Sequence, residues 1–558
     1  MENPAPDNAD SQEQWQASMV PPGSILDRGM SEEKRTDDRP AEDGALNSGR
    51  LIPPPAEEIY LQRANDFQLT EGVATGAQDS DPPIVVSDGS TDHTAKGWAG
   101  MQRGQSTHAT RGTNILDSGV SSTLSALGTK AGKEPKHRFR SLARLLDQQM
   151  LGEAFRQLKR RAAPGIDGVT HGEYAENLEE NLLRLVTRLK EGSYRAQPVK
   201  RQWIAKPGSD KLRPLGIPVL EDKIVQQAVR MILEPIWEND FVEESIGYRP
   251  GCRARQETLA LSEVLYGGAY RWIVEADIKG FFDHIRHDWL VTMLEERIAD
   301  CSLIRLIRKW LNAGVMEELK HWSPSTEGTP QGGVISPLLG NIYLHFVQDL
   351  WIKKVIAKDS KGSVLFRRYA DDSIVAFERK EDAEAYLRKL PERLAKFGLE
   401  LAAEKSALVK FNRWESESSG KFTFLGFDFY WAQNRRNPKA KNVKRRTNAK
   451  KFRASLAALK EWLKKARSLP LRDIIATLRR KLQGYWNYYC VIGNSERTSA
   501  YSYEVVQLVY KWLNRRSQRK SFTAESFKAA WKRWRMPQPR VNEKPLPRSA
   551  RQIQPSPA

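Results

Sequence analysis

Residues 364–377 read Val-Leu-Phe-Arg-Arg-Tyr-Ala-Asp-Asp-Ser-Ile-Val-Ala-Phe, with two adjacent acids between two runs of strand-forming residues. This pattern predicts a β-hairpin that carries Asp371 and Asp372 at its tip. Adjacent carboxylates repel each other, so a fold that holds them together needs a compensating cation. Two divalent ions about 4 Å apart are the usual arrangement for an in-line displacement at phosphorus. The hairpin therefore indicates nucleotidyl transfer, provided that a third carboxylate lies nearby.

A candidate for this third acid follows another apolar segment. Residues 272–276 predict a strand that leads directly into Asp277. Asp277, Asp371 and Asp372 would surround two Mg²⁺ ions, because magnesium prefers oxygen ligands. One ion would activate a primer 3′ oxygen, and the other would hold a triphosphate and the leaving pyrophosphate. In the alternative interpretation Asp277 caps a helix and the acid pair is a solvated turn; the occurrence of both signals at strand ends favours the metal site.

The charge of the chain is large and unevenly distributed. The 558 residues carry a net charge of +20, yet residues 1–100 hold 19 acidic and 7 basic residues, which leaves 50 acidic and 82 basic residues in the remainder. Such an excess of bases indicates a polyanionic partner, most simply a nucleic acid. A membrane surface is the alternative, but no apolar run reaches the ~18 residues needed to span a bilayer. With three widely spaced cysteines and no signal-peptide pattern, we expect a cytoplasmic protein without disulfides or a CxxC zinc site.

Composition and periodicity divide the chain into four parts. Residues 1–135 are rich in Pro, Gly, Ser and acids and are predicted to be disordered. Residues 136–435 mix helical and strand patterns, residues 436–540 are basic and helical, and residues 541–558 form a Pro-rich tail that is also predicted to be disordered. A hairpin is predicted from strands at 199–204 and 212–217, and a strand pair around Leu408 and Phe424. The helices are expected at 221–238, 253–266, 286–314, 336–356, 381–397, 450–467 and 471–481.

Several motifs in a fixed order give the chain a family resemblance. Residues 163–169 (APGIDGV) and 206–218, which end in RPLGIP, precede 247–251 (GYRPG) and the Asp277 segment. Residues 328–333 (GTPQGG), 369–372 (YADD), 404–406 (EKS), 424–427 (FLGF) and 484–489 (GYWNYY) follow. In this order they resemble the motifs of group II intron-encoded reverse transcriptases with maturase activity, from about residue 140 to 540.

The resemblance implies an α/β (α+β) right-hand polymerase with fingers, palm and thumb, followed by an α-helical maturase domain, called X. Fingers and palm would occupy 136–435, and the thumb and domain X would occupy 436–540. Asp277, Asp371 and Asp372 carry over as catalytic metal ligands for two Mg²⁺ ions, and the carbonyl of Ile278 would complete the shell. The expected partners are dNTPs, a template RNA, a primer or target DNA, and the group II intron RNA.

The resemblance also assigns residues to the incoming nucleotide. Lys206 and Arg213 would neutralise its triphosphate, as a point charge and a planar fork respectively. Phe282 would act as a steric gate against a ribose 2′-OH, with its neighbour Phe281 in the core. Gln331 would contact the base or sugar, and Lys405 would help to neutralise or protonate the pyrophosphate.

The basic region after residue 440 corresponds to the maturase part. Arg479, Arg480 and Lys481 are the candidate RNA contacts, whereas Trp486 and Tyr489 are assigned to the core by default. Many family members end in an endonuclease domain with paired-Cys motifs; because this chain has no CxxC, we expect no endonuclease of its own and an external source for the priming strand. The rival functions are a non-enzymatic splicing factor and a reverse transcriptase for phage defence or diversification. The monomer and the homodimer both stay open, as does a nucleoid location in a bacterium.

Overall fold

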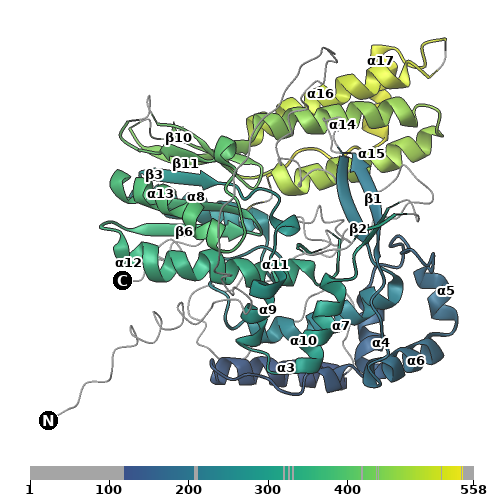
Figure 1. Cartoon of the computed structure of the whole chain (residues 1–558). Helices are drawn as coiled ribbons and strands as arrows, with labels where there is room; N and C mark the ends of the chain where they lie inside the picture. Colours follow the sequence, from purple (N-terminus) through teal and green to yellow (C-terminus); the bar gives the residue numbers. More distant parts are fainter. Residues whose placement is uncertain are drawn as a thin grey trace, which may run out of the picture. The chain divides into compact units, whose positions relative to one another are not determined.

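The central sheet carries the predicted hairpin. The computed structural model describes residues 118–205, 212–317, 321–323, 327–329, 332–415, 419–434, 437, 439–516, 518–541 and 543. Within them, β6 (Val364–Tyr369) and β7 (Asp372–Phe377) pair antiparallel across the two-residue turn Ala370-Asp371. The four-stranded sheet has the order β6-β7-β3-β8, with β3 at Trp272–Ala276 and β8 at Ala407–Lys410 (Figure 1). All of its neighbouring strands are antiparallel, β7 and β3 are the inner strands, and Ile273 and Val274 of β3 are both fully buried.

A second sheet has the order β2-β1-β4-β5. Its first two strands, β1 (Val199–Ala205) and β2 (Leu212–Ile217), confirm the predicted hairpin. The other two strands are β4 (Val315–Glu317) and β5 (His321–Ser323). Helix α7 (Leu220–Trp237) is buried along most of its length, including its polar residues Asp222, Lys223 and Gln226. The other helices of the N-terminal half are α3 (Ser118–Lys133), α4 (Gln148–Gln157), α5 (His171–Glu176), α6 (Leu178–Lys190), α8 (Ala254–Tyr266), α9 (His287–Glu295) and α10 (Cys301–Leu311), with 3-10 turns η1 (Ala143–Leu145) and η2 (Phe281–Asp283).

The segment 336–356 is helical, as predicted, but only its first part is an α-helix. After α11 (Ser336–Leu344), the chain widens into two π-helical segments, η3 (His345–Asp349) and η4 (Ile352–Ile356), and then reaches α12 (Ala357–Asp359). π-Helical turns are rare and are often found at functional sites. Helix α13 (Lys380–Lys396) contacts β3 and β7, and the 3-10 turn η5 (Ala403–Lys405) leads into β8.

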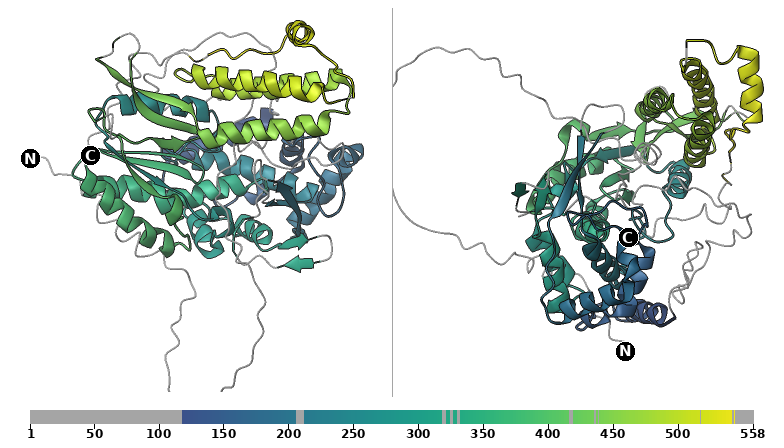
Figure 2. Two further views of the ribbon diagram at one scale, coloured as in Figure 1. Left: turned by 90° about the horizontal axis from the view of Figure 1, so that it is seen from above. Right: turned by 90° about the vertical axis from the view of Figure 1, so that its right-hand side faces the viewer.

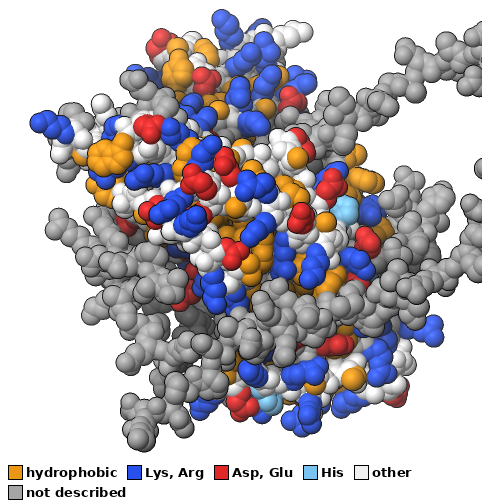
Figure 3. Space-filling model, turned by 60° about the vertical axis from the view of Figure 1, so that its left-hand side comes forward, with side chains coloured by type: hydrophobic (Ala, Val, Ile, Leu, Met, Phe, Trp, Pro, Cys, Tyr) orange, Lys and Arg blue, Asp and Glu red, His pale blue; other side chains and the backbone are white. Residues whose placement is uncertain are grey.

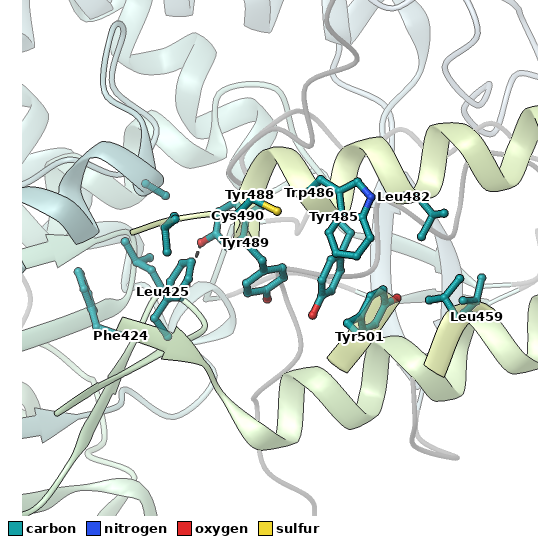
Figure 4. Close-up of a cluster of buried hydrophobic side chains, with 14 of the residues drawn as sticks. Phe424, Leu425, Leu459, Leu482, Tyr485, Trp486, Tyr488, Tyr489, Cys490 and Tyr501 are labelled. Carbon is teal, nitrogen blue, oxygen red and sulfur yellow. Dashed lines mark hydrogen bonds between the residues drawn. The ribbon is translucent and has the colours of Figure 1, made fainter. Parts of the chain in front are cut away.

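A third sheet and four helices form the C-terminal region. The sheet has the order β11-β10-β9, with strands at Lys441–Thr447, Phe427–Gln433 and Phe422–Phe424. The helices are α14 (Ala449–Ala466), α15 (Leu471–Tyr489), α16 (Ser495–Leu513) and α17 (Ala524–Arg533), and Figure 2 shows the green and yellow helices of this region grouped together. Tyr485 and Tyr501 stack with ring centroids 3.7 Å apart, in an apolar cluster that continues into Phe424 and Phe427 of the third sheet (Figure 4). Trp486 and Tyr489 are buried in it, as expected for core residues.

Four expectations about elements differ from the structure. The predicted helix 286–314 is two helices, because Asp300 caps the N-terminus of α10 through the backbone N–H groups of Ser302 and Leu303. The strands at Leu408 and Phe424 do not pair with each other: β8 pairs with β3, and β9 pairs with β10. Helix α15 continues beyond residue 481 to Tyr489.

The fourth difference concerns the predicted disordered termini. Helix α3 begins at Ser118, inside the stretch 1–135, and its C-terminal end is held by the buried guanidinium of Arg297, which donates to the carbonyls of Ala131 and Glu134. At the other end, Glu543 lies inside the predicted tail and its carboxylate is buried in an ion pair with Arg445. Among the helices of the described ranges, none is both long and apolar enough to cross a membrane.

Candidate active site

The three predicted carboxylates lie at one end of the central sheet. Tyr369 is paired with Asp372, and Ala276 is paired with Ser373. Continuing the β3–β7 register by one residue brings Asp277 opposite Asp372. Directly opposite residues of an antiparallel pair point to the same face and lie about 4.5–5.5 Å apart at Cβ. The sheet therefore places Asp277 and Asp372 side by side, with Asp371 in the adjoining turn.

The electrostatics of Asp372 reflect this crowding. Burial and then the charges of Asp371 and Asp277 raise its pKa to about 7. The backbone N–H of Leu425 opposes the shift, although at 3.5 Å from Oδ2 it makes only a weak hydrogen bond. A nearby cation would lower this pKa, so the raised value indicates that the described part of the fold places no compensating cation beside Asp372.

Asp277 has a different environment, because a lysine is already bound to it. Lys405 Nζ donates to Asp277 Oδ2 at 2.7 Å, and both side chains are less than a third exposed. The backbone of the same segment is tied to β3, since Ala402 N–H donates to the carbonyl of Asp277. Ile278 is buried, and a backbone bridge joins it to Leu401. Sequence reasoning assigned Lys405 to pyrophosphate; the structure brings its ammonium to a carboxylate of the predicted triad.

The residues present fit a divalent cation in their chemistry. They provide carboxylate oxygens, the ligands that Mg²⁺ prefers, and the pKa of Asp372 is raised by burial and then by the neighbouring acids. Within the described part of the chain, no three acidic, His or Cys side chains are already gathered as a metal cluster. This agrees with the Lys405 ammonium lying on Asp277. The ammonium contacts Oδ2 of Asp277, and an ion held by all three acids would share this carboxylate with it or displace it.

The turn of the hairpin is packed against a glycine loop. A Cβ on Gly247 would lie 2.2 Å from the amide nitrogen of Ala370 and 2.9 Å from the carbonyl carbon of Tyr369. Only glycine allows backbone to approach this closely. Ala370 itself has φ 56°, a left-handed conformation that few non-glycine residues adopt. The motif around Gly247 thus serves as a support for the carboxylate turn.

Sequence reasoning missed Arg368, the residue just before Tyr369. Its side chain is fully buried and forms an ion pair with Asp349, which is fully buried as well. The guanidinium also donates to the carbonyl of Ala370 in the turn. An arginine within a predicted buried strand was the available signal, because a buried arginine needs a partner.

The two adjacent phenylalanines differ as predicted. Phe281 is buried, whereas Phe282 is partly exposed. A Cβ on Gly340 would lie 3.0 Å from the Phe282 ring and 3.2 Å from the Phe281 ring. Gly340 therefore leaves room for both rings beside α11.

Three further residues were predicted to contact the nucleotide: Lys206, Arg213 and Gln331. Lys206 and Gln331 lie outside the described residues. For Arg213 the backbone alone is described: it stands in β2, paired with Ile204. The roles of these three residues remain predictions.

The predicted RNA contacts lie on α15. Arg479 and Arg480 are exposed, and Lys481 is partly exposed. Arg479 donates to the carbonyl of Trp534 at 2.6 Å, and the Lys481 ammonium lies 5.3 Å from the ring centroid of Trp462. Figure 3 shows many Lys and Arg side chains in the upper part of the molecule, where the C-terminal helices lie. This surface has the charge that a nucleic acid backbone requires.

The helix that carries these bases also contacts the turn between β9 and β10, next to the carboxylates. Tyr488 Oη donates to the carbonyl of Leu425 at 2.8 Å (Figure 4). The same Leu425 lies with its amide next to Asp372. One residue of the β9–β10 turn thus touches both α15 and a carboxylate of the site.

Comparison with known proteins agrees with this arrangement. Residues 204–429 match the family described as reverse transcriptase (RNA-dependent DNA polymerase), and residues 450–535 match the maturase-specific domain of group II introns. The chain is 32% identical to the group II intron-encoded protein LtrA of Lactococcus lactis subsp. cremoris, across 58% of this chain and 66% of LtrA. It is 34% identical to protein YkfC of Escherichia coli K12, across 46% of this chain and 75% of YkfC.

A more distant relative is an uncharacterized 91 kDa protein in the cob intron of Schizosaccharomyces pombe, 29% identical across 65% of this chain and 52% of the relative. The matches thus span just under two thirds of LtrA and about half of the fission yeast protein. The two family matches follow each other in the chain and contain, respectively, the carboxylate hairpin and the basic helix α15. The chain belongs to the group II intron-encoded reverse transcriptase/maturase family.

Proposed function

We propose that this protein is an RNA-directed DNA polymerase that adds dNTPs to a primer 3′-OH, and that it also acts as a maturase on its intron RNA. The observation that carries the polymerase half is the register of β3 and β7, which sets Asp277 opposite Asp372 beside the turn that holds Asp371. Family membership alone would also fit a splicing factor that has lost catalysis, whereas the three acids supply what nucleotidyl transfer requires.

In this proposal Asp277, Asp371 and Asp372 hold two Mg²⁺ ions, with the carbonyl of Ile278 in the shell. When bound, the metal would make the primer hydroxyl a better nucleophile and balance the charge of the triphosphate. Asp372 must lose its proton for this role, and a metal on Asp277 would compete with the ammonium of Lys405 for the carboxylate. The released Lys405 would then lie close to the departing pyrophosphate, where a cation is useful.

The nucleotide pocket is proposed from the family pattern and from the position of Phe282. Lys206 and Arg213 would bind the triphosphate, and Gln331 would contact the base or sugar. The partly exposed ring of Phe282, held beside Gly340, would exclude a ribose 2′-OH and so favour dNTPs over NTPs. The template would be RNA and the primer DNA.

The maturase half rests on the basic surface of the C-terminal helices. Arg479, Arg480 and Lys481 of α15 would contact intron RNA phosphates. The protein needs no catalytic residue for splicing, because binding to the active fold of the RNA stabilises that fold. Since the substrates are nucleic acids and the relatives LtrA and YkfC come from bacteria, we place this activity in the bacterial cytoplasm.

Primer extension on an RNA template tests the polymerase half. Asp371→Ala combined with Asp372→Ala should abolish dNTP incorporation with Mg²⁺ while leaving intron RNA binding and splicing assistance intact. Asp382→Asn, on helix α13, is the matched control and should extend like the parent. A double variant that extends as fast as the parent would refute the assignment; a folded double variant that no longer assists splicing would refute the separation of the two functions.

A further inference from the structure

We propose that Arg368 is a positioning residue for catalysis: it sets the Ala370-Asp371 turn, and Asp349 on the π-helical segment η3 sets Arg368. This inference rests on the proposed polymerase function. Arg368 touches neither substrate nor metal in this account. It acts through the backbone of the turn that carries the carboxylates.

Every N–H donor of the Arg368 guanidinium has a hydrogen-bond acceptor. Nε and Nη2 donate to the two oxygens of Asp349, at 2.7 and 2.6 Å. The second bond of Nη2 goes to Ser245 Oγ at 2.6 Å, and Nη1 donates to Asn341 Oδ1 at 3.0 Å and to the carbonyl of Ala370 at 2.9 Å. A bidentate pair with three further bonds leaves the planar group one orientation.

The bond to Ala370 is the one that reaches the site. The carbonyl of Ala370 belongs to the peptide that joins it to Asp371, so a donor fixed on that oxygen fixes the plane of this peptide. The need for such a donor is clear from the conformation, because Ala370 has φ 56°. A left-handed alanine persists only where the surroundings determine it. Gly247 presses on the same turn, and its carbonyl accepts from Asn341 at 2.6 Å.

The second strand of the hairpin is held from the same helical segment. Gln348 Nε2 donates to Ser373 Oγ at 2.9 Å, and both side chains are buried. Arg368 and Ser373 face each other in the register, one pair behind Tyr369 and Asp372. Gln348 and Asp349, consecutive residues of η3, therefore hold both strands of the hairpin at one residue pair, next to the pair that contains Asp372.

The π-helical geometry makes this grip possible. An α-helix sets consecutive side chains about 100° apart, and the wider turn of a π-helix reduces that angle. The change in pitch leaves backbone carbonyls off their usual partners, and Arg393 donates to those of Val347 and Phe346 at 2.9 and 2.8 Å. The π-helical geometry, with Arg393 bound to its free carbonyls, thus occurs where Gln348 and Asp349 both contact the hairpin.

A purely structural ion pair would predict a different set of results. Replacing a buried ion pair by apolar residues of similar volume is often neutral or stabilising, so stability alone gives no reason to keep charges here. Only the positioning role depends on the bond to the Ala370 carbonyl. Activity and stability should therefore separate when the pair is replaced as a whole.

The test uses the full chain with Arg368→Lys and with the double replacement Arg368→Met/Asp349→Met. Lysine keeps the charge but lacks the fork, so we expect kcat for dNTP incorporation to fall about 100-fold, the effect of a misplacement near 1 Å, with little change in the KM for dNTP. Arg297→Lys is the matched control: Arg297 is also buried and donates to backbone carbonyls, but it faces Asp240 and α3. It should lower Tm and leave kcat of the folded protein within twofold.

The double replacement decides between the two roles. Positioning predicts that the folded double variant remains as slow as Arg368→Lys, because methionine leaves the carbonyl of Ala370 without its donor, with faster amide hydrogen exchange across 369–373 in both variants. Recovery of kcat together with Tm, or a folded Arg368→Lys variant as fast as the parent with unchanged exchange, would overturn the inference. A parent that does not extend primers would instead refute the proposed function, and the exchange measurement would still test the grip on the hairpin.

Discussion

Asp372→Asn should make the metal-free protein more stable while removing its polymerase activity. The folded protein holds the Asp372 proton up to a pH of about 7, whereas an unfolded aspartate loses it near 3.8. Between these values the folded state binds more protons, so the stability contributed by this group falls as the pH rises through the window. Above pH ~7 the whole penalty is present, and asparagine removes it because it carries no charge.

The size of the effect follows from the pKa difference. A rise from 3.8 to about 7 corresponds to about 4 kcal/mol at about 1.36 kcal/mol per pKa unit, which is an upper limit. Asparagine keeps an oxygen that can accept the weak hydrogen bond from Leu425. At the roughly 2–4 °C per kcal/mol typical of domains of about 150–250 residues, a gain of this size raises Tm by roughly 10 °C.

Thermal unfolding in a chelator near pH 8 measures this gain. It should shrink by about 1.4 kcal/mol for each pH unit below ~7 and vanish near pH 4. Excess Mg²⁺ should raise the Tm of the parent more than that of the variant, because the ion binds the ionised acid. Asp382→Asn is the control: its carboxylate accepts N–H bonds from Lys361 and Gly362, so the same change should not stabilise. An Asp372→Asn protein no more stable than the parent near pH 8 would refute the reasoning.

Three other substitutions test the surroundings of the site. Gly247→Ala should cost about 2 kcal/mol or more and slow extension sharply, because its Cβ would lie 2.2 Å from the amide nitrogen of Ala370; a folded variant with parental kcat would contradict this. Tyr488→Phe should lower the unfolding free energy by about 1–3 kcal/mol, since the Leu425 carbonyl loses its donor. Tyr489→Phe is its control and should change the unfolding free energy little, because the Tyr489 hydroxyl has no hydrogen-bond partner among the described residues. Equal losses in the two variants would count against the contact between Tyr488 and Leu425. Phe282→Ala should raise incorporation of NTPs relative to dNTPs in single-nucleotide extension, and an unchanged ratio would exclude the steric gate.

Much of the site was predictable because its signals are local. The alternation of strand formers around Asp371 and Asp372 and the apolar run before Asp277 define strand ends within a residue or two, and the register then brings the acids together. The separation of Phe281 from Phe282 follows from adjacent side chains pointing apart. The motif at 247–251 served only as a sign of the family, and the contact of Gly247 with the carboxylate turn became clear only in three dimensions.

The features that escaped prediction depend on distant contacts or on rare helix geometry. The partner of Arg368 lies 19 residues earlier and reaches it from a π-helical turn that no periodicity announces. Helix α3 has few large apolar residues, and its packing on α7 and its contacts with Arg297 supply what its own pattern lacks. The break before α10 had a local signal, since Asp300 precedes an apolar helix, yet the continuous apolar pattern on both sides outweighed it. The motif at 404–406 predicted that Lys405 acts on the pyrophosphate, whereas its ion pair with Asp277 became visible only in the folded structure.

In the proposed mechanism Asp277, Asp371 and Asp372 together hold the catalytic metal ions. Its most direct test is anomalous diffraction from crystals of the protein with Mn²⁺, an RNA template, a chain-terminated DNA primer and the next dNTP. We expect two anomalous peaks, both within direct ligand distance of these carboxylates, with the Lys405 ammonium displaced from Asp277. Metal bound elsewhere while Asp277 keeps its ion pair with Lys405 would contradict the claim.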